Sequence, residues 1–128
     1  MATRFRPLSP HLQVYRFTLT MTMSIVHRGT GVALYFGTLL IVLWLGAAAL
    51  GEAPFALVNR VLSWWPAQAI LFLATWALFH HMLGGVRHFV WDSVRALEPA
   101  SREWIVRIQL IGSVLLTLAA WVLLVWLK

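Results

Sequence analysis

The chain has 128 residues, of which 61% are hydrophobic and only 11% charged; its net charge is +6 and it contains no cysteine. A soluble domain of this size cannot bury so much apolar surface, so the composition indicates an integral membrane protein. The lack of cysteine excludes disulfides and cysteine-ligated iron–sulfur clusters within this chain, and the scatter of basic residues at the ends of apolar segments argues against nucleic-acid binding.

Residues 1–28 are predicted to form a polar arm and a short interfacial helix. Pro7 and Pro10 oppose a helix before residue 10. The mixed apolar and polar residues over about Leu12–Met21 fit a short amphipathic helix at the membrane surface. A signal peptide also starts with a basic segment and an apolar run, but here both segments are too long for one. We therefore expect no cleavage in this region.

A polar cluster marks the start of the first apolar stretch. Ser24, His27 and Arg28 share one helical face, because positions three and four apart are neighbours. Arg28 alone would be explained as a topology anchor at the membrane surface. The three together fit a small carbonyl-bearing ligand or a haem propionate, since arginine offers a fork to a carboxylate and serine can donate to a carbonyl.

Three apolar stretches, about 29–50, 66–90 and 105–127, are long enough to cross a bilayer, which takes about 20 residues. Only a helix satisfies its own backbone hydrogen bonds in lipid. We therefore predict one all-α membrane domain over residues 1–128, a three-transmembrane-helix bundle with a short N-terminal amphipathic segment. Residues 51–65 are expected to form a turn-rich connection without chemistry, Pro99 is expected to break any helix in the second connection, and the third span is expected to serve packing and lipid contact.

The second span ends in the sequence HHMLGGVRHFVWD, residues 80–92. Ionisable residues at that depth are rare and indicate a functional site. From His81, one helical face carries small residues and a further histidine, namely Ala74, Ala77, Gly84, Gly85 and His88. A haem coordinated by His81 would lie over the two glycines without clashes, and a neutral imidazole is a standard axial ligand.

Two alternatives remain open for this segment. Small residues on a transmembrane helix also allow close helix packing, although packing alone does not require the histidines or Arg87. His80 points about 100° away from His81, so the two are not expected to serve one site. His80 is the alternative ligand.

The basic residues predict the orientation. They gather before the first span and around the second connection, and are sparse elsewhere: Arg4, Arg6, Arg16 and Arg28, then Arg87, Arg95, Arg102 and Arg107, against Arg60 and Lys128. By the positive-inside rule, the N-terminus and the second connection are cytoplasmic. The polar cluster of the first span and the histidines of the second then lie at one depth and can share one cofactor.

These segments resemble the cytochrome b556 subunits of succinate dehydrogenase. The resemblance rests on an N-terminal run and two motifs: Arg6-Pro7-Leu8-Ser9-Pro10-His11-Leu12, Ser24-x-x-His27-Arg28-x-Thr30 and His81-x-x-x-Gly85-Val86-Arg87-His88-Phe89-Val90-Trp91-Asp92. Both motifs occur in this order, and together with the three spans they cover nearly the whole chain.

The resemblance implies a membrane anchor that is not catalytic alone. Such a subunit, with a second membrane anchor subunit, holds a flavoprotein and an iron–sulfur protein at the bilayer. Electrons from succinate pass through FAD and iron–sulfur clusters in those partners to ubiquinone, and haem b lies between the two anchors. The N-terminus has no long Arg- and Ser-rich transit peptide, so we expect a bacterial inner membrane rather than the mitochondrial inner membrane, with the N-terminus in the cytoplasm. Whether the four-chain complex trimerises stays open.

Carried over by position, His81 is the axial haem ligand and binds the haem iron, and the second ligand comes from the partner anchor. Ser24 and Arg28 correspond to quinone-binding residues. His27, Arg28 and His88 correspond to residues near the haem propionates. The resemblance assigns no role to Arg87.

Two other functions compete with this one. The first is an anchor of quinol:fumarate reductase, because sequence does not set the direction of electron flow. The second is a haem-free structural anchor or a small transporter subunit. In a haem-free protein, the His81 face would pack against a helix.

Overall fold

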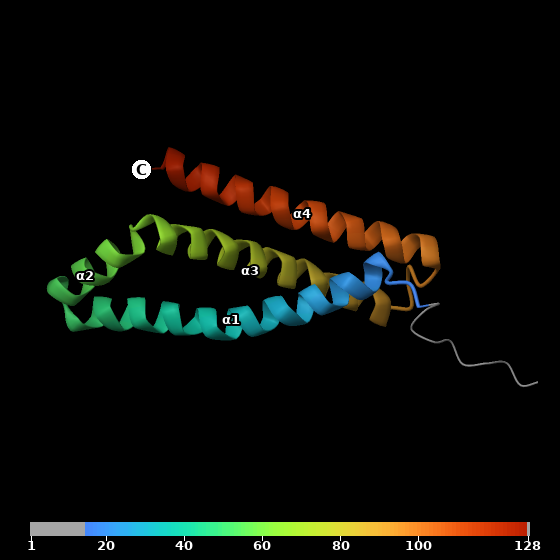
Figure 1. The fold of residues 1–128 in the computed structure, drawn as a ribbon, viewed down its shortest axis with the longest axis horizontal. Coiled ribbons are helices and arrows are strands. Elements are labelled where there is room, and N and C mark those ends of the chain that lie inside the picture. Colours follow the sequence, from blue (N-terminus) through green and yellow to red (C-terminus); the bar gives the residue numbers. More distant parts are fainter. Residues whose placement is uncertain (1–14, 128) are drawn as a thin grey trace, which may run out of the picture.

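The computed structural model describes residues 15–127, and this part of the chain is all-helical, as predicted. Its elements are α1 (Leu19–Leu50), α2 (Glu52–Leu62), α3 (Trp65–Asp92) and α4 (Pro99–Trp126). The three long helices α1, α3 and α4 are each long and apolar enough to cross a membrane. They run in alternating directions, and α3 lies between α1 and α4 (Figure 1).

Helix α1 begins about ten residues before the expected first span. Thr18 caps it, since its hydroxyl accepts a hydrogen bond from the backbone N–H of Met21 at 3.3 Å. No proline interrupts residues 19–50, so the polar cluster and the apolar span form one helix. Residues 15–18 are not helical, and the interfacial helix expected over about Leu12–Met21 is therefore not a separate element there. The arm and its motif, residues 6–12, lie outside the described residues.

The expected turn-rich connection of residues 51–65 contains a helix, α2, and this part of the prediction was wrong. Gly51 adopts φ 118°, which permits the sharp reversal between α1 and α2. Pro54 is compatible with α2 because it lies in the first turn, where no backbone donor is needed. The indole N–H of Trp44 donates to the side chain of Asn59 at 3.1 Å and ties α2 to α1.

Pro99, which was expected to break a helix, begins one instead. It occupies the first position of α4, where its fixed φ suits the helix and its missing N–H costs nothing. The connection before it is tight, and both Val94 and Ala96 adopt positive φ, 59° and 54°. Helix α4 therefore starts six residues before the predicted third span and packs along α3.

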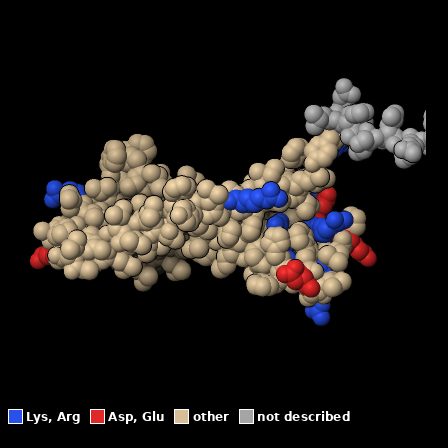
Figure 2. Space-filling view, turned by 90° about the horizontal axis from the view of Figure 1, so that it is seen from below, with Lys and Arg blue, Asp and Glu red and all other residues tan. Residues whose placement is uncertain are grey.

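The surface and the interior are arranged as in a membrane protein. Charged side chains gather at the end where α1 begins, α3 ends and α4 begins, which we call the basic end; a smaller group lies at the opposite end, and the band between them is uncharged on the face shown in Figure 2. The described interior is rich in polar side chains: Thr30, His80, Arg87, Gln109, Ser113 and Thr117 are all buried. Large apolar residues are exposed on the outside of the long helices, which is typical of helices that lie in lipid, and polar contacts therefore carry much of the helix packing.

Candidate functional site

Helices α1 and α3 meet through a pair of histidines. The rings of His27 and His81 are stacked, with centroids 4.2 Å apart and planes within 5° of parallel. His27 Nε2 lies 3.2 Å from the backbone oxygen of His81, and His81 Nδ1 lies 3.1 Å from the backbone oxygen of His27. Carbonyl oxygens only accept, so these contacts place a proton on Nε2 of His27 and on Nδ1 of His81. The reciprocal bonds fix the two helices against each other.

Two glycines make this close approach possible. The His81 ring lies against Gly31, where an added Cβ would be 3.0 Å from Cε1 of the ring. The His27 ring lies against Gly84, where an added Cβ would overlap the ring. The space at Gly84, expected to lie under a macrocycle, is thus taken by His27. At Gly85 an added Cβ would meet nothing within 4 Å, so this glycine remains open.

The contacts of His81 leave one ring nitrogen for other chemistry. Nδ1 is directed to the His27 carbonyl, with the Thr30 hydroxyl 3.5 Å away. Nε2 makes no hydrogen bond with any residue in 15–127, and the side chain is half-buried. With Nδ1 carrying the proton, Nε2 carries a lone pair, which is the state a metal-binding imidazole needs.

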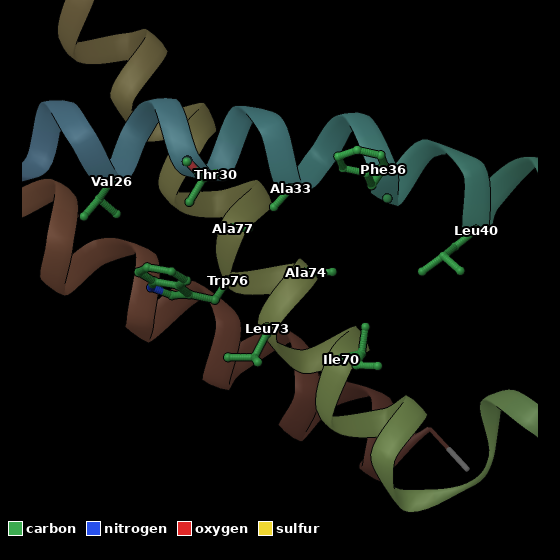
Figure 3. A pocket seen from close by; sticks show the side chains of 12 residues that line it. Val26, Thr30, Ala33, Phe36, Leu40, Ile70, Leu73, Ala74, Trp76 and Ala77 are labelled. Atoms are coloured by element: carbon green, nitrogen blue, oxygen red, sulfur yellow. The ribbon is translucent and has the colours of Figure 1, made fainter.

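An apolar groove runs between α1 and α3 on the side of the pair away from the basic end (Figure 3). Its volume is about 670 Å³, within the range of small-molecule sites. Small residues from both helices form much of its wall, namely Gly29, Ala33 and Gly37 from α1 and Ala74 and Ala77 from α3. The two alanines belong to the predicted strip of small residues, and Thr30 is the polar residue of the lining. The groove suits a flat or extended apolar group.

His80 faces the other way, toward α4. It is fully buried, and the Gln109 side-chain amide lies 3.1 Å from both its Nε2 and its backbone oxygen. The Ser113 hydroxyl is 3.5 Å from Nδ1, and the Trp76 ring lies 5.1 Å away. Both ring nitrogens of His80 therefore have polar neighbours within the chain. Use of His80 as the alternative ligand would require this network to open.

Ser24 and Arg28, the predicted quinone-binding residues, lie one turn apart on α1. Ser24 is half-buried and Arg28 is exposed. Neither side chain hydrogen-bonds to another described residue, His81 included. An exposed guanidinium at this position can reach a ligand or another chain beside α1.

The remaining predicted residues lie toward the basic end of α3. His88 is exposed and lies edge-on to His27, with ring centroids 5.4 Å apart. Arg87 is only 3% exposed, and its guanidinium lies 4.8 Å from the centre of the Trp91 ring. Two of its nitrogens, Nε and Nη1, have no hydrogen-bond partner within residues 15–127, and none of the carboxylates there pairs with it.

The polar face of α4 was missed as part of this region. The third span was expected to serve packing and lipid contact. Gln109, Ser113 and Thr117 are buried in it, and the first two also make polar contacts with His80, which were not expected. Their spacing of four residues in an otherwise apolar part of α4 is the signal that could have placed them on one face.

Comparison with known proteins gives consistent matches over this chain. A family model described as "Succinate dehydrogenase/Fumarate reductase transmembrane subunit" matches residues 2–124. The succinate dehydrogenase cytochrome b556 subunit of Paracoccus denitrificans is 42% identical over 111 residues, covering 87% of this chain and 85% of that protein. The subunit of the same name from Rickettsia felis is 33% identical, covering 91% of each chain. The cytochrome b560 subunit of Reclinomonas americana is 34% identical over 92% of this chain and 85% of its own length.

Proposed function

Because the chain belongs to the succinate dehydrogenase/fumarate reductase transmembrane subunit family, we propose that it is the haem b-binding membrane anchor of a succinate dehydrogenase. In this role it helps to form the ubiquinone site and is not catalytic alone. The whole of residues 1–128 serves as one membrane domain. The flavin and iron–sulfur chemistry belongs to partner chains, since this chain has no cysteine to hold a cluster.

The observation that carries the haem assignment is the hydrogen bonding of His81. Its Nδ1–H is directed to the His27 carbonyl at 3.1 Å, which fixes the tautomer and leaves Nε2 available to iron. The open backbone at Gly85 and the apolar groove beside Ala77 suit the flat apolar body of a haem. When bound, haem b would supply a one-electron redox centre within the membrane. The second axial ligand would come from a second anchor subunit.

The residues at the basic end would bind the polar groups of the quinone and of the haem. Ser24 and Arg28 lie one turn apart, so their side chains could donate to the carbonyl oxygens of a quinone beside α1. His27, Arg28 and His88 would lie near the haem propionates, a role supported by the edge-on contact of His27 and His88 at 5.4 Å. Protons for quinone reduction would arrive from the aqueous phase at this end.

The bacterial relatives support a bacterial inner membrane. The excess of arginine at the basic end supports an orientation with the N-terminus and the connection between α3 and α4 in the cytoplasm. The iron–sulfur subunit and the flavoprotein would then dock on that side, next to the quinone site. A complex that works in the direction of fumarate reduction would use the same residues, and the family description covers both reactions.

One observation favours a second candidate function, a haem-free structural anchor. The His81 ring packs against α1 and is stacked on His27, and the His27 ring fills the notch at Gly84. A haem on His81 would therefore have to bind beside this stack or displace His27. The two candidates differ in whether the assembled complex contains haem.

Purification of the complex through an affinity tag on this chain tests the proposal. We expect a flavoprotein and an iron–sulfur protein to co-purify, with one b-type haem per flavin and succinate-driven reduction of a ubiquinone analogue. A complex with flavin and iron–sulfur clusters but no haem would support the haem-free anchor. Recovery of this chain without flavin would contradict the anchor role itself.

A further inference from the structure

Helix α4 contacts α3 through buried polar side chains that the functions above do not use. Gln109, Ser113 and Thr117 are each at most 2% exposed. Gln109 and Ser113 contact His80 of α3, whereas the Thr117 hydroxyl bonds within α4. In lipid there is no hydrophobic driving force between helices, because lipid tails are as apolar as the side chains. Polar contacts and close-fitting small residues must therefore set the rotation of α3.

The Gln109 amide makes two of these contacts, both with His80. Its nitrogen lies 3.1 Å from His80 Nε2 and 3.1 Å from the His80 backbone oxygen. An amide NH₂ has two hydrogens, so it can donate to both acceptors. With His80 Nε2 accepting, the ring proton lies on Nδ1 and points to the Ser113 oxygen at 3.5 Å. The Ser113 hydroxyl in turn donates to the Leu110 carbonyl at 2.8 Å.

Gly84 connects this network to the histidine pair. An added Cβ at Gly84 would be 3.1 Å from the Gln109 amide nitrogen and would overlap the His27 ring. The three long helices thus meet at one backbone position of α3, with α4 on one side and α1 on the other.

The rotation of α3 decides where His81 points. Consecutive residues of an α-helix are about 100° apart, so holding His80 on α4 turns His81 toward α1. We propose that Gln109, assisted by Ser113, is a positioning residue for His81: it fixes the rotation of α3 through His80 and thereby orients the imidazole plane of the haem ligand. This inference rests on the proposed haem-binding function.

The test compares three variants of the complex purified through this chain. Gln109→Met removes both donors at similar volume, Ser113→Ala removes the acceptor for His80 Nδ1–H, and Thr117→Val is the matched control. Thr117 is equally buried in the same face, but its hydroxyl bonds within α4, to the Ser113 carbonyl at 2.7 Å. The measurements are the largest g value of the oxidised haem in electron paramagnetic resonance and the haem midpoint potential.

In Gln109→Met we expect both quantities to shift, since the g values of a low-spin haem depend on the planes of its axial imidazoles. Ser113→Ala should give a smaller shift in the same direction, and Thr117→Val should match the unsubstituted complex. A Gln109→Met complex with unchanged g value and potential would overturn the inference. If Gln109→Met does not assemble, an unchanged Ser113→Ala complex would overturn it. Absence of haem from the unsubstituted complex would instead refute the proposed function, and this inference with it.

Discussion

Substitution of Arg28 by leucine is expected to lower succinate-driven quinone reduction about 10- to 100-fold, because a hydrogen bond from a charged donor contributes about 1.5–3 kcal/mol and each ~1.4 kcal/mol is a factor of ten. Arg28 is exposed beside Ser24 and makes no hydrogen bond within the described part of the chain. Its loss should therefore affect the bound quinone rather than the fold. The measurement compares the rate at which succinate reduces a ubiquinone analogue with the rate at which it reduces an artificial dye. The dye accepts electrons before they reach the membrane subunits.

Arg95→Leu is the control for the loss of one positive charge. Arg95 is exposed in the connection between α3 and α4, at the same basic end. We expect its two rates to stay near those of the unsubstituted complex, whereas Arg28→Leu should keep only the dye rate. An Arg28→Leu complex that keeps both rates would contradict a quinone-binding role, and loss of both rates would contradict the expectation that the fold is unaffected.

Substitution of Gly84 by alanine is expected to destabilise the chain more than any other single-methyl change within α1 and α3. The added methyl would overlap the His27 ring, and Gln109 closes the opposite side at 3.1 Å. The His27 ring cannot turn away without breaking its contact with the His81 carbonyl at 3.2 Å. Overpacking of a tight interface costs about 1–3 kcal/mol, and here it separates the two helices that carry the histidine pair.

Gly46→Ala is the matched control for that substitution. Gly46 lies in the apolar part of α1, near the end of the helix, and an added Cβ there would meet nothing within 4 Å. Two quantities are measured for both substitutions: the midpoint of thermal unfolding of the purified complex in detergent, and its haem-to-flavin ratio. We expect Gly46→Ala to match the unsubstituted complex and Gly84→Ala to fall in both quantities. Equal stability of the two variants would mean that α1 and α3 are not in contact at Gly84.

The three spans were predictable because their signal is strong and local. A run of about 20 apolar residues is long enough to cross a bilayer whatever its neighbours are, and all three predicted spans lie within long helices. Helix boundaries were less predictable. Residues 51–65 were expected to be turn-rich and Pro99 to break a helix, yet Pro54 and Pro99 each lie in the first turn of a helix, where proline is tolerated.

The partners of the histidines were predictable only in part. Alternating directions of the helices placed His27 and His81 at one depth, and the structure brings them into contact. The rotation of helices that are apolar on most faces is not encoded in their periodicity, so the stacking of the two rings and the binding of His80 by Gln109 could not be derived.

The most direct test of the haem assignment is a dithionite-reduced minus oxidised absorption spectrum of the complex purified through this chain, with His81→Ala beside His80→Ala. His81→Ala should lose or shift the b-type band while the flavoprotein and iron–sulfur protein remain bound. His80→Ala should keep the band, because its ring is held by Gln109 and Ser113 rather than by iron. A band unchanged in His81→Ala would contradict ligation by His81 and move the ligand to His80 or His88.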